Sequence, residues 1–82
     1  MKDNSDMNLL NRITINPDIL HGKPAIRNKR YSVESILSYL AGGDTTGSLL
    51  EEFSDLEEDD IKACLLYAQK MLENNTAFLT AS

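Results

Sequence analysis

The chain has few of the residues that metal centres and disulfide-stabilised domains need. Its 82 residues include one cysteine, Cys64, one histidine, His21, and no tryptophan. A single cysteine cannot form an internal disulfide, and one histidine with one cysteine cannot make a zinc cluster. The sequence therefore predicts no disulfide, no metal site and no cofactor.

Long hydrophobic runs are also missing. The longest apolar stretch is far shorter than the roughly 20 residues that cross a bilayer, and residues 1–6 contain no apolar core of a secretory signal. We therefore expect a cytoplasmic protein that has no membrane partner. Apolar residues make up 41% of the chain and charged residues 26%. This composition and length are typical of one globular domain.

Charge is distributed unevenly along the chain. The net charge is −5, but residues 12–30 contain five basic side chains and one acid, which gives that segment +4. Residues 44–60 contain eight acids and no base. Such polarity fits self-association or two partners of opposite charge.

The first part of the chain has the pattern of a strand and a hairpin. Residues 12–16 alternate polar and apolar side chains and contain β-branched residues, which predicts a strand. Turn signals follow at Pro17 and in residues 21–24. Residues 24–31 indicate a short hairpin whose tip is Asn28, a residue that tolerates positive φ.

Three helices are predicted after the hairpin. Ser32 is a suitable N-cap for the first, and the pair Gly42-Gly43 supplies its stop. Asp44 or Thr45 caps a short second helix. A third helix begins near Glu57 and runs to about Glu73, and a link of about three residues before it matches a helix-turn-helix.

The third helix carries one apolar stripe and an acidic start. The acids of residues 57–60 are expected to lie in solvent, where they stabilise the helix end. Consecutive positions on a helix point in different directions, so these acids do not predict a metal site. The expected core stripe consists of Ile61, Leu65, Ala68 and Leu72, with Cys64 and Met71 beside it.

These elements form a single small α+β domain that is mostly α-helical. We expect an N-terminal strand or hairpin arm, followed by a three-helix, homeodomain-like core with a helix-turn-helix. The predicted domain covers residues 11–73, with the arm in 11–31 and the helices in 32–73. Residues 1–10 are expected to be a flexible N-terminus and residues 74–82 a tail.

Two runs of the sequence resemble the bacterial domain-of-unknown-function family 433 (DUF433). The first is Gly-Lys-Pro-Ala-Ile-Arg in residues 22–27, and the second is Leu-Glu-Glu-Asp-Asp-Ile in residues 56–61. The resemblance extends over about residues 11–72. It implies a homeodomain-like or winged-helix-like fold and an antitoxin, often encoded beside a PIN-like ribonuclease toxin. Further matching positions are Pro17, Leu20, Arg30, Val33, Ile36, Leu37, Leu40, Gly43, Tyr67 and Ala68.

The chain departs from the family pattern at three places. Residues 28–30 read Asn-Lys-Arg where the family often has Gly-Thr-Arg, so Lys29 adds positive charge at the hairpin tip. Phe53-Ser54 replaces a Tyr-Pro pair, and Glu57 replaces a threonine, which is a better N-cap. These changes leave the expected core intact.

The third helix is a poor candidate for reading DNA. A recognition helix points its N-terminal residues at base edges in the major groove, and here that end is acidic. If the chain binds operator DNA, we expect the basic arm to contact phosphates or a groove. The candidate residues for binding nucleic acid or toxin are Lys23, Arg27, Lys29 and Arg30.

The basic arm can also bind to a PIN-like toxin and inhibit it. A guanidinium pairs a carboxylate bidentately, so Arg27 or Arg30 can enter a cluster of metal-binding carboxylates. Alternatively, the acidic second and third helices cover a basic RNA-binding surface of the toxin. A third interpretation is that Arg27 pairs with an acid of its own domain.

The resemblance and the charges thus predict an antitoxin that inhibits the toxin and binds its own promoter. The alternative is a non-catalytic interaction or dimerisation module that has the helix-turn-helix shape and does not bind DNA. No enzyme is predicted, since His21 lies in a turn and Cys64 is expected to pack as a small apolar residue.

A homodimer is also predicted. An exposed strand edge is a liability in a small protein unless another strand covers it. Pairing across a two-fold axis through residues 13–15 or 25–27 covers such an edge and gives the symmetry that a palindromic operator needs.

Overall fold

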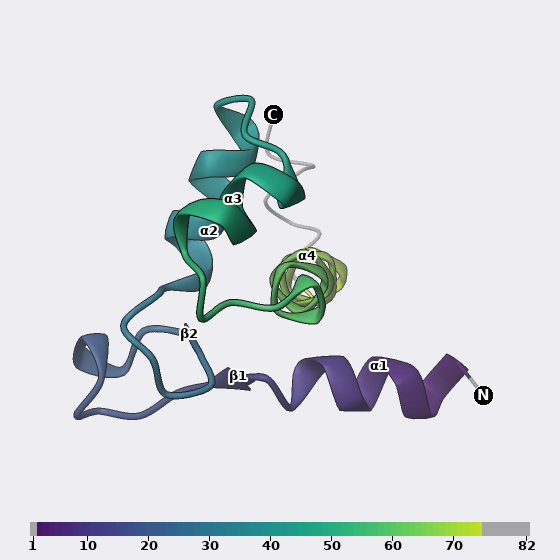
Figure 1. Ribbon diagram of the computed structural model, residues 1–82. Helices are drawn as coiled ribbons and strands as arrows, with labels where there is room; N and C mark the ends of the chain where they lie inside the picture. Colours follow the sequence, from purple (N-terminus) through teal and green to yellow (C-terminus); the bar gives the residue numbers. More distant parts are fainter. Residues whose placement is uncertain (1, 75–82) are drawn as a thin grey trace, which may run out of the picture.

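The computed structural model describes residues 2–74 and shows a small hairpin joined to a helical body (Figure 1). The prediction of a mostly helical domain with an N-terminal hairpin followed by helices is confirmed. The part of the predicted tail beyond Asn74 lies outside the described residues. In chain order, the elements are α1 (Lys2–Leu10), β1 (Ile13–Thr14), η1 (Leu20–Gly22), β2 (Ala25–Ile26), α2 (Val33–Ala41), α3 (Thr46–Glu52) and α4 (Glu58–Glu73).

The hairpin is short, and its second strand has partners on both sides. β1 and β2 are antiparallel, with Ile13 opposite Ile26 and Thr14 opposite Ala25. On the other side, Ala25 bridges to Ser32, and the Ile26 N–H donates to the Tyr31 carbonyl at 3.0 Å. Because Ala25 and Ile26 are also buried, β2 is not a free edge. The strand at residues 25–26 therefore has no open side for a second copy, and the homodimer stays a prediction.

The turn after β2 confirms the predicted tip. Arg27 and Asn28 have φ values of 47° and 57°, and the Lys29 N–H donates to the Ile26 carbonyl at 2.7 Å. An asparagine tolerates this left-handed backbone better than most residues, which explains its place at the turn.

The helix ends follow the capping chemistry expected from the sequence. Ser32 accepts a hydrogen bond from the Ser35 N–H at 3.0 Å, and Thr45 accepts one from the Ser48 N–H at 3.0 Å. Gly43, with φ of 110°, provides the left-handed stop after α2.

Helix α4 is the central element of the fold. It packs against α1, α2, α3 and β1, and Figure 1 shows it end-on between α1 and the α2–α3 pair. The buried core cluster consists of Ile26, Val33, Ile36, Leu49, Leu56, Ile61 and Cys64.

The predicted core stripe on α4 is correct at Ile61 and wrong at two other positions. Leu65 and Leu72 are 49% and 48% exposed, whereas Cys64 is fully buried. Two stripes with helical spacing pass through Ile61, one by way of Leu65 and one by way of Cys64. Leucine is more hydrophobic than cysteine, so the sequence favoured the stripe through Leu65. In the structure, α2 and α3 pack against the side of α4 that carries Cys64.

Helix α1 was not predicted, since residues 1–10 were expected to be flexible. Their sequence is mostly polar and has no amphipathic stripe. Helix α1 packs against α4, and Asn8 and Leu9 share a small pocket with Asp59 and Lys62 of the first turns of α4. The helix therefore depends on a tertiary contact that local sequence does not reveal. Among residues 2–74, no helix has the length and apolar character of a membrane span.

Candidate functional site

The two runs that carry the family resemblance meet in space. Arg27, the last residue of the first run, forms a two-pronged ion pair with Asp60 in the second. Its Nε donates to Asp60 Oδ1 at 3.0 Å and its Nη2 donates to Oδ2 at 2.6 Å. The neighbouring residues Ile26 and Ile61 both belong to the buried core. The hairpin is therefore joined to the start of α4 by this ion pair and by a shared buried core.

Asp60 is fully buried, and its carboxylate has four donors. Besides Arg27, Arg12 Nη1 donates to Oδ1 at 3.0 Å and the Glu57 N–H donates to Oδ2 at 2.8 Å. Burial by itself raises the pKa of Asp60, but the hydrogen bonds from Arg27, Glu57 and Arg12 outweigh it. They hold the pKa below its ordinary value. The carboxylate is thus kept ionised inside the fold.

Arg12 extends this network to the exposed acids of the α4 start. Its Nη1 lies 2.7 Å from Glu57 Oε1, and its Nη2 lies 3.8 Å from Asp59 Oδ2. We call Arg12, Arg27, Glu57 and Asp60 the Asp60 cluster. Two of the five basic residues in 12–30 and two of the four acids in 57–60 are thus paired within this cluster.

A second set of contacts holds the turn after β2 near Asp55. Arg27 Nη2 donates to the Asp55 carbonyl at 3.0 Å, and the Tyr31 hydroxyl donates to its carboxylate at 2.8 Å. The hydrogen bond from Tyr31 lowers the pKa of Asp55. Lys29 Nζ lies 3.8 Å from Asp55 Oδ2, at the long limit of an ion pair.

The four predicted binding residues have different environments. Arg27 is engaged internally with Asp60, and Lys29 faces Asp55. Lys23 and Arg30 are exposed and form no ion pair or side-chain hydrogen bond with the described part of the chain. Of the interpretations of Arg27 that the sequence left open, pairing inside its own domain is the one seen here.

Sequence reasoning missed Asp60 as a structural centre. All four acids of residues 57–60 were expected to lie in solvent, and this is wrong for Asp60. A signal was present, because Asp60 is the third residue of α4 and follows Glu57 by three positions. At that spacing, a carboxylate reaches back to the N-cap backbone N–H.

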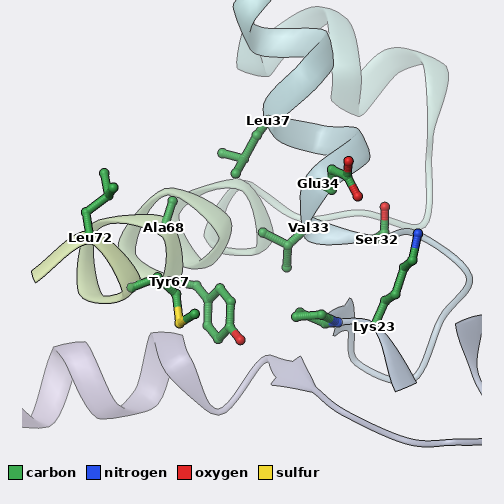
Figure 2. A pocket seen from close by; sticks show the side chains of 10 residues that line it. Lys23, Ser32, Val33, Glu34, Leu37, Tyr67, Ala68 and Leu72 are labelled. Atoms are coloured by element: carbon green, nitrogen blue, oxygen red, sulfur yellow. The ribbon is translucent and has the colours of Figure 1, made fainter. Parts of the chain in front are cut away.

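Helices α2 and α4 also border an open, mostly apolar groove of about 520 Å³ (Figure 2). One wall is formed by Val33 and Leu37 of α2, and the other by the C-terminal half of α4. Lys23, Ser32 and Glu34 lie together at one end in Figure 2. Most of the groove lining is apolar, so this surface is suited to packing.

Cys64 and His21 have the surroundings that were expected from the sequence. Cys64 is fully buried, and burial raises the pKa of its thiol to about 12. His21 is exposed in η1 with φ of 57°. Within residues 2–74, no three His, Cys, Asp or Glu side chains are placed to hold a metal ion.

Comparison with known proteins identifies the family and little else. Residues 13–68 match the family described as "Protein of unknown function (DUF433)". The chain is 32% identical over 57 residues to an uncharacterized protein, y4eO, of Sinorhizobium fredii (strain NBRC 101917 / NGR234). This match covers 70% of the chain and 26% of the relative, so the chain spans about a quarter of that protein's length. No solved structure matched the chain.

The family match includes all of β1, β2, α2 and α3 and most of α4, and thus both halves of the ion pair between Arg27 and Asp60. It covers well over half of the chain. This chain belongs to the DUF433 family.

Proposed function

We propose that this chain is the antitoxin of a toxin–antitoxin pair and that it binds and inhibits a PIN-like ribonuclease. The observation that carries the proposal is Arg30, which is exposed and has no ionic partner among residues 2–74. The likeness of DUF433 proteins to antitoxins supplies the class of partner. A guanidinium without an internal partner is suited to a nuclease centre built from carboxylates.

The geometry of the hairpin supports presentation of Arg30. It follows a turn closed by hydrogen bonds from Lys29 to Ile26 and from Ile26 to Tyr31. Arg27 fixes the same turn to Asp60. Because the backbone is already ordered, little backbone conformational entropy is lost when Arg30 meets a partner. Arg27 thus serves as a positioning residue for the binding surface.

Complex formation with the neighbouring gene's product tests this proposal. We expect the wild-type chain to co-purify with that protein and Arg30→Glu to abolish the complex, because the variant places a carboxylate against carboxylates. Lys62→Glu makes the same charge change at an exposed position on α4 and is expected to leave the complex intact. Absence of a wild-type complex at micromolar concentration rejects the toxin-binding role.

The exposed cations of the arm also support binding to operator DNA. Lys23 and Arg30 are free of described partners, so both are available to phosphates. In gel shifts on the chain's own upstream DNA at low salt, we expect Lys23→Ala with Arg30→Ala to weaken binding. Added salt is expected to weaken the wild type in the same way, since counterions compete for phosphates. Equal binding by both chains removes the arm from this role.

A specific observation favours the second candidate, an interaction module that does not bind DNA. The first turn of α4 presents Glu58 and Asp59, and α1 packs against this helix. A reading helix needs this end free and not acidic. No complex with the neighbouring gene's product, together with no gel shift by the wild type, identifies this alternative. Both candidates are binding roles, and we propose no catalysis.

A further inference from the structure

Helix α4 extends beyond the elements that bury its first half. In its first half, Asp60, Ile61 and Cys64 are fully buried. The same face continues in the second half with Ala68 and Met71, which line the groove (Figure 2). Met71 is 52% exposed. The groove leaves this part of the face open to one side, although its side chains are apolar. A contiguous exposed apolar surface of this kind is typical of an interaction site.

The spacing along this face is that of a helix pairing with another helix. Ile61, Cys64, Ala68 and Met71 recur at intervals of three and four residues, as the a and d positions of a heptad do. Leu72 and Leu65 flank the uncovered half, and each is about half exposed. Ala68 is small and lies between Leu65 and Leu72, so a second helix can approach closely at that point.

The charges at the groove allow a second copy of the same chain to dock. The chain has a net charge of −5, which disfavours most contacts between copies. The groove is an exception, since its charged lining residues are one base, Lys23, and one acid, Glu34, at the same end. Two copies that meet there bring equal numbers of opposite charges together.

We propose that a second copy of this chain docks in the groove, with the C-terminal half of its α4 antiparallel to the same half of the first. Under two-fold symmetry, one contact covers the same uncovered face on both copies. Ala68 then lies near the axis, and Leu65 of each copy faces Leu72 of the other. This interface differs from a strand-edge dimer and does not rest on the proposed antitoxin role.

The mass in solution gives the first test. Light scattering on the eluting wild-type chain is expected to give twice the monomer mass of 9.2 kDa at micromolar concentrations. Leu72→Lys is expected to return the mass to that of the monomer without loss of helix, because Leu72 is half exposed. Ile15→Lys, at an exposed apolar residue of the arm, is expected to leave the dimer intact.

A cysteine cross-link gives a second readout that does not depend on a destabilising change. Ala68→Cys places a thiol near the proposed axis, and mild oxidation is expected to give a covalent dimer. The native Cys64 is fully buried, so it does not compete. Lys62→Cys, an exposed position toward α1, is the control and is expected to remain mostly monomeric.

Two results overturn the proposal. One is a wild-type chain that stays monomeric together with an Ala68→Cys variant that cross-links no faster than Lys62→Cys. If deletion of residues 75–82 then induces dimerisation, that segment is the occupant of the groove. The other is a dimer that Ile15→Lys dissociates and Leu72→Lys does not, which places the contact at the hairpin.

Discussion

Arg27→Met is expected to lower the free energy of unfolding by about 2–3 kcal/mol. The substitution keeps most of the apolar stem and removes the guanidinium, which leaves the buried carboxylate of Asp60 with only Arg12 and the Glu57 N–H as donors. Breaking a buried ion pair typically costs about 3–5 kcal/mol, and we expect less because the Arg27 side chain is 32% exposed. Urea denaturation followed by circular dichroism measures this change.

Arg30→Met is the matched control, since it makes the same substitution three residues later at an exposed position. We expect its effect to stay within about 0.5 kcal/mol. Equal losses in both variants contradict the assignment of Arg27 as the anchor of the hairpin.

Asp60 also gives stability a definite dependence on pH. Its pKa is lower in the folded chain than the ordinary value of 3.8, so the unfolded chain binds more protons in that range. The contribution of this carboxylate is fully present above pH 3.8 and is lost as the pH falls through the folded pKa. Asp60→Asn is therefore expected to flatten the acid limb of a plot of stability against pH. An acid limb identical to that of the wild type argues against a paired Asp60.

Ile26→Ala is the second large effect, with an expected loss of about 2–5 kcal/mol. Ile26 is fully buried in the same core cluster as Ile61, and shortening a buried isoleucine removes apolar contacts and leaves a cavity. A chain of this length has a total stability of about 4–12 kcal/mol, so this one substitution brings it close to unfolding. Thermal and urea denaturation both report the loss.

Ile15→Ala provides the control for that experiment. It deletes the same atoms from the same residue type in the same arm, but Ile15 is 63% exposed. We expect a change within about 0.5 kcal/mol. Comparable losses of unfolding free energy at Ile26 and Ile15 mean that β2 is not buried in the core.

Local chemistry accounts for what the sequence predicted well. Ser32 and Thr45 are side chains that bond helix N-termini in almost any context, and Asn28 is tolerated where φ is positive. Each of these signals acts within a few residues of itself. The caps of α2 and α3, the turn after β2 and the order of the three later helices therefore follow from neighbouring residues alone.

The parts that failed depend on contacts between distant residues. Leu65 and Cys64 both lie about one helical turn from Ile61, and only the position of α2 decides which of them is buried. Helix α1 has no intrinsic stripe and depends on packing against α4. Asp60 looks like one acid in a run of four until Arg12 and Arg27, more than 30 residues earlier in the chain, are placed beside it.

The central claim is that the two family runs are joined by the ion pair between Arg27 and Asp60, which fixes the hairpin that presents Arg30. A double-mutant cycle measures this joint most directly, through the unfolding free energies of Arg27→Met, Asp60→Asn, the double variant and the wild type. We predict a coupling energy of about 1–3 kcal/mol, since residues in direct contact interact by such amounts. A coupling energy near zero, with both single variants as stable as the wild type, contradicts the account.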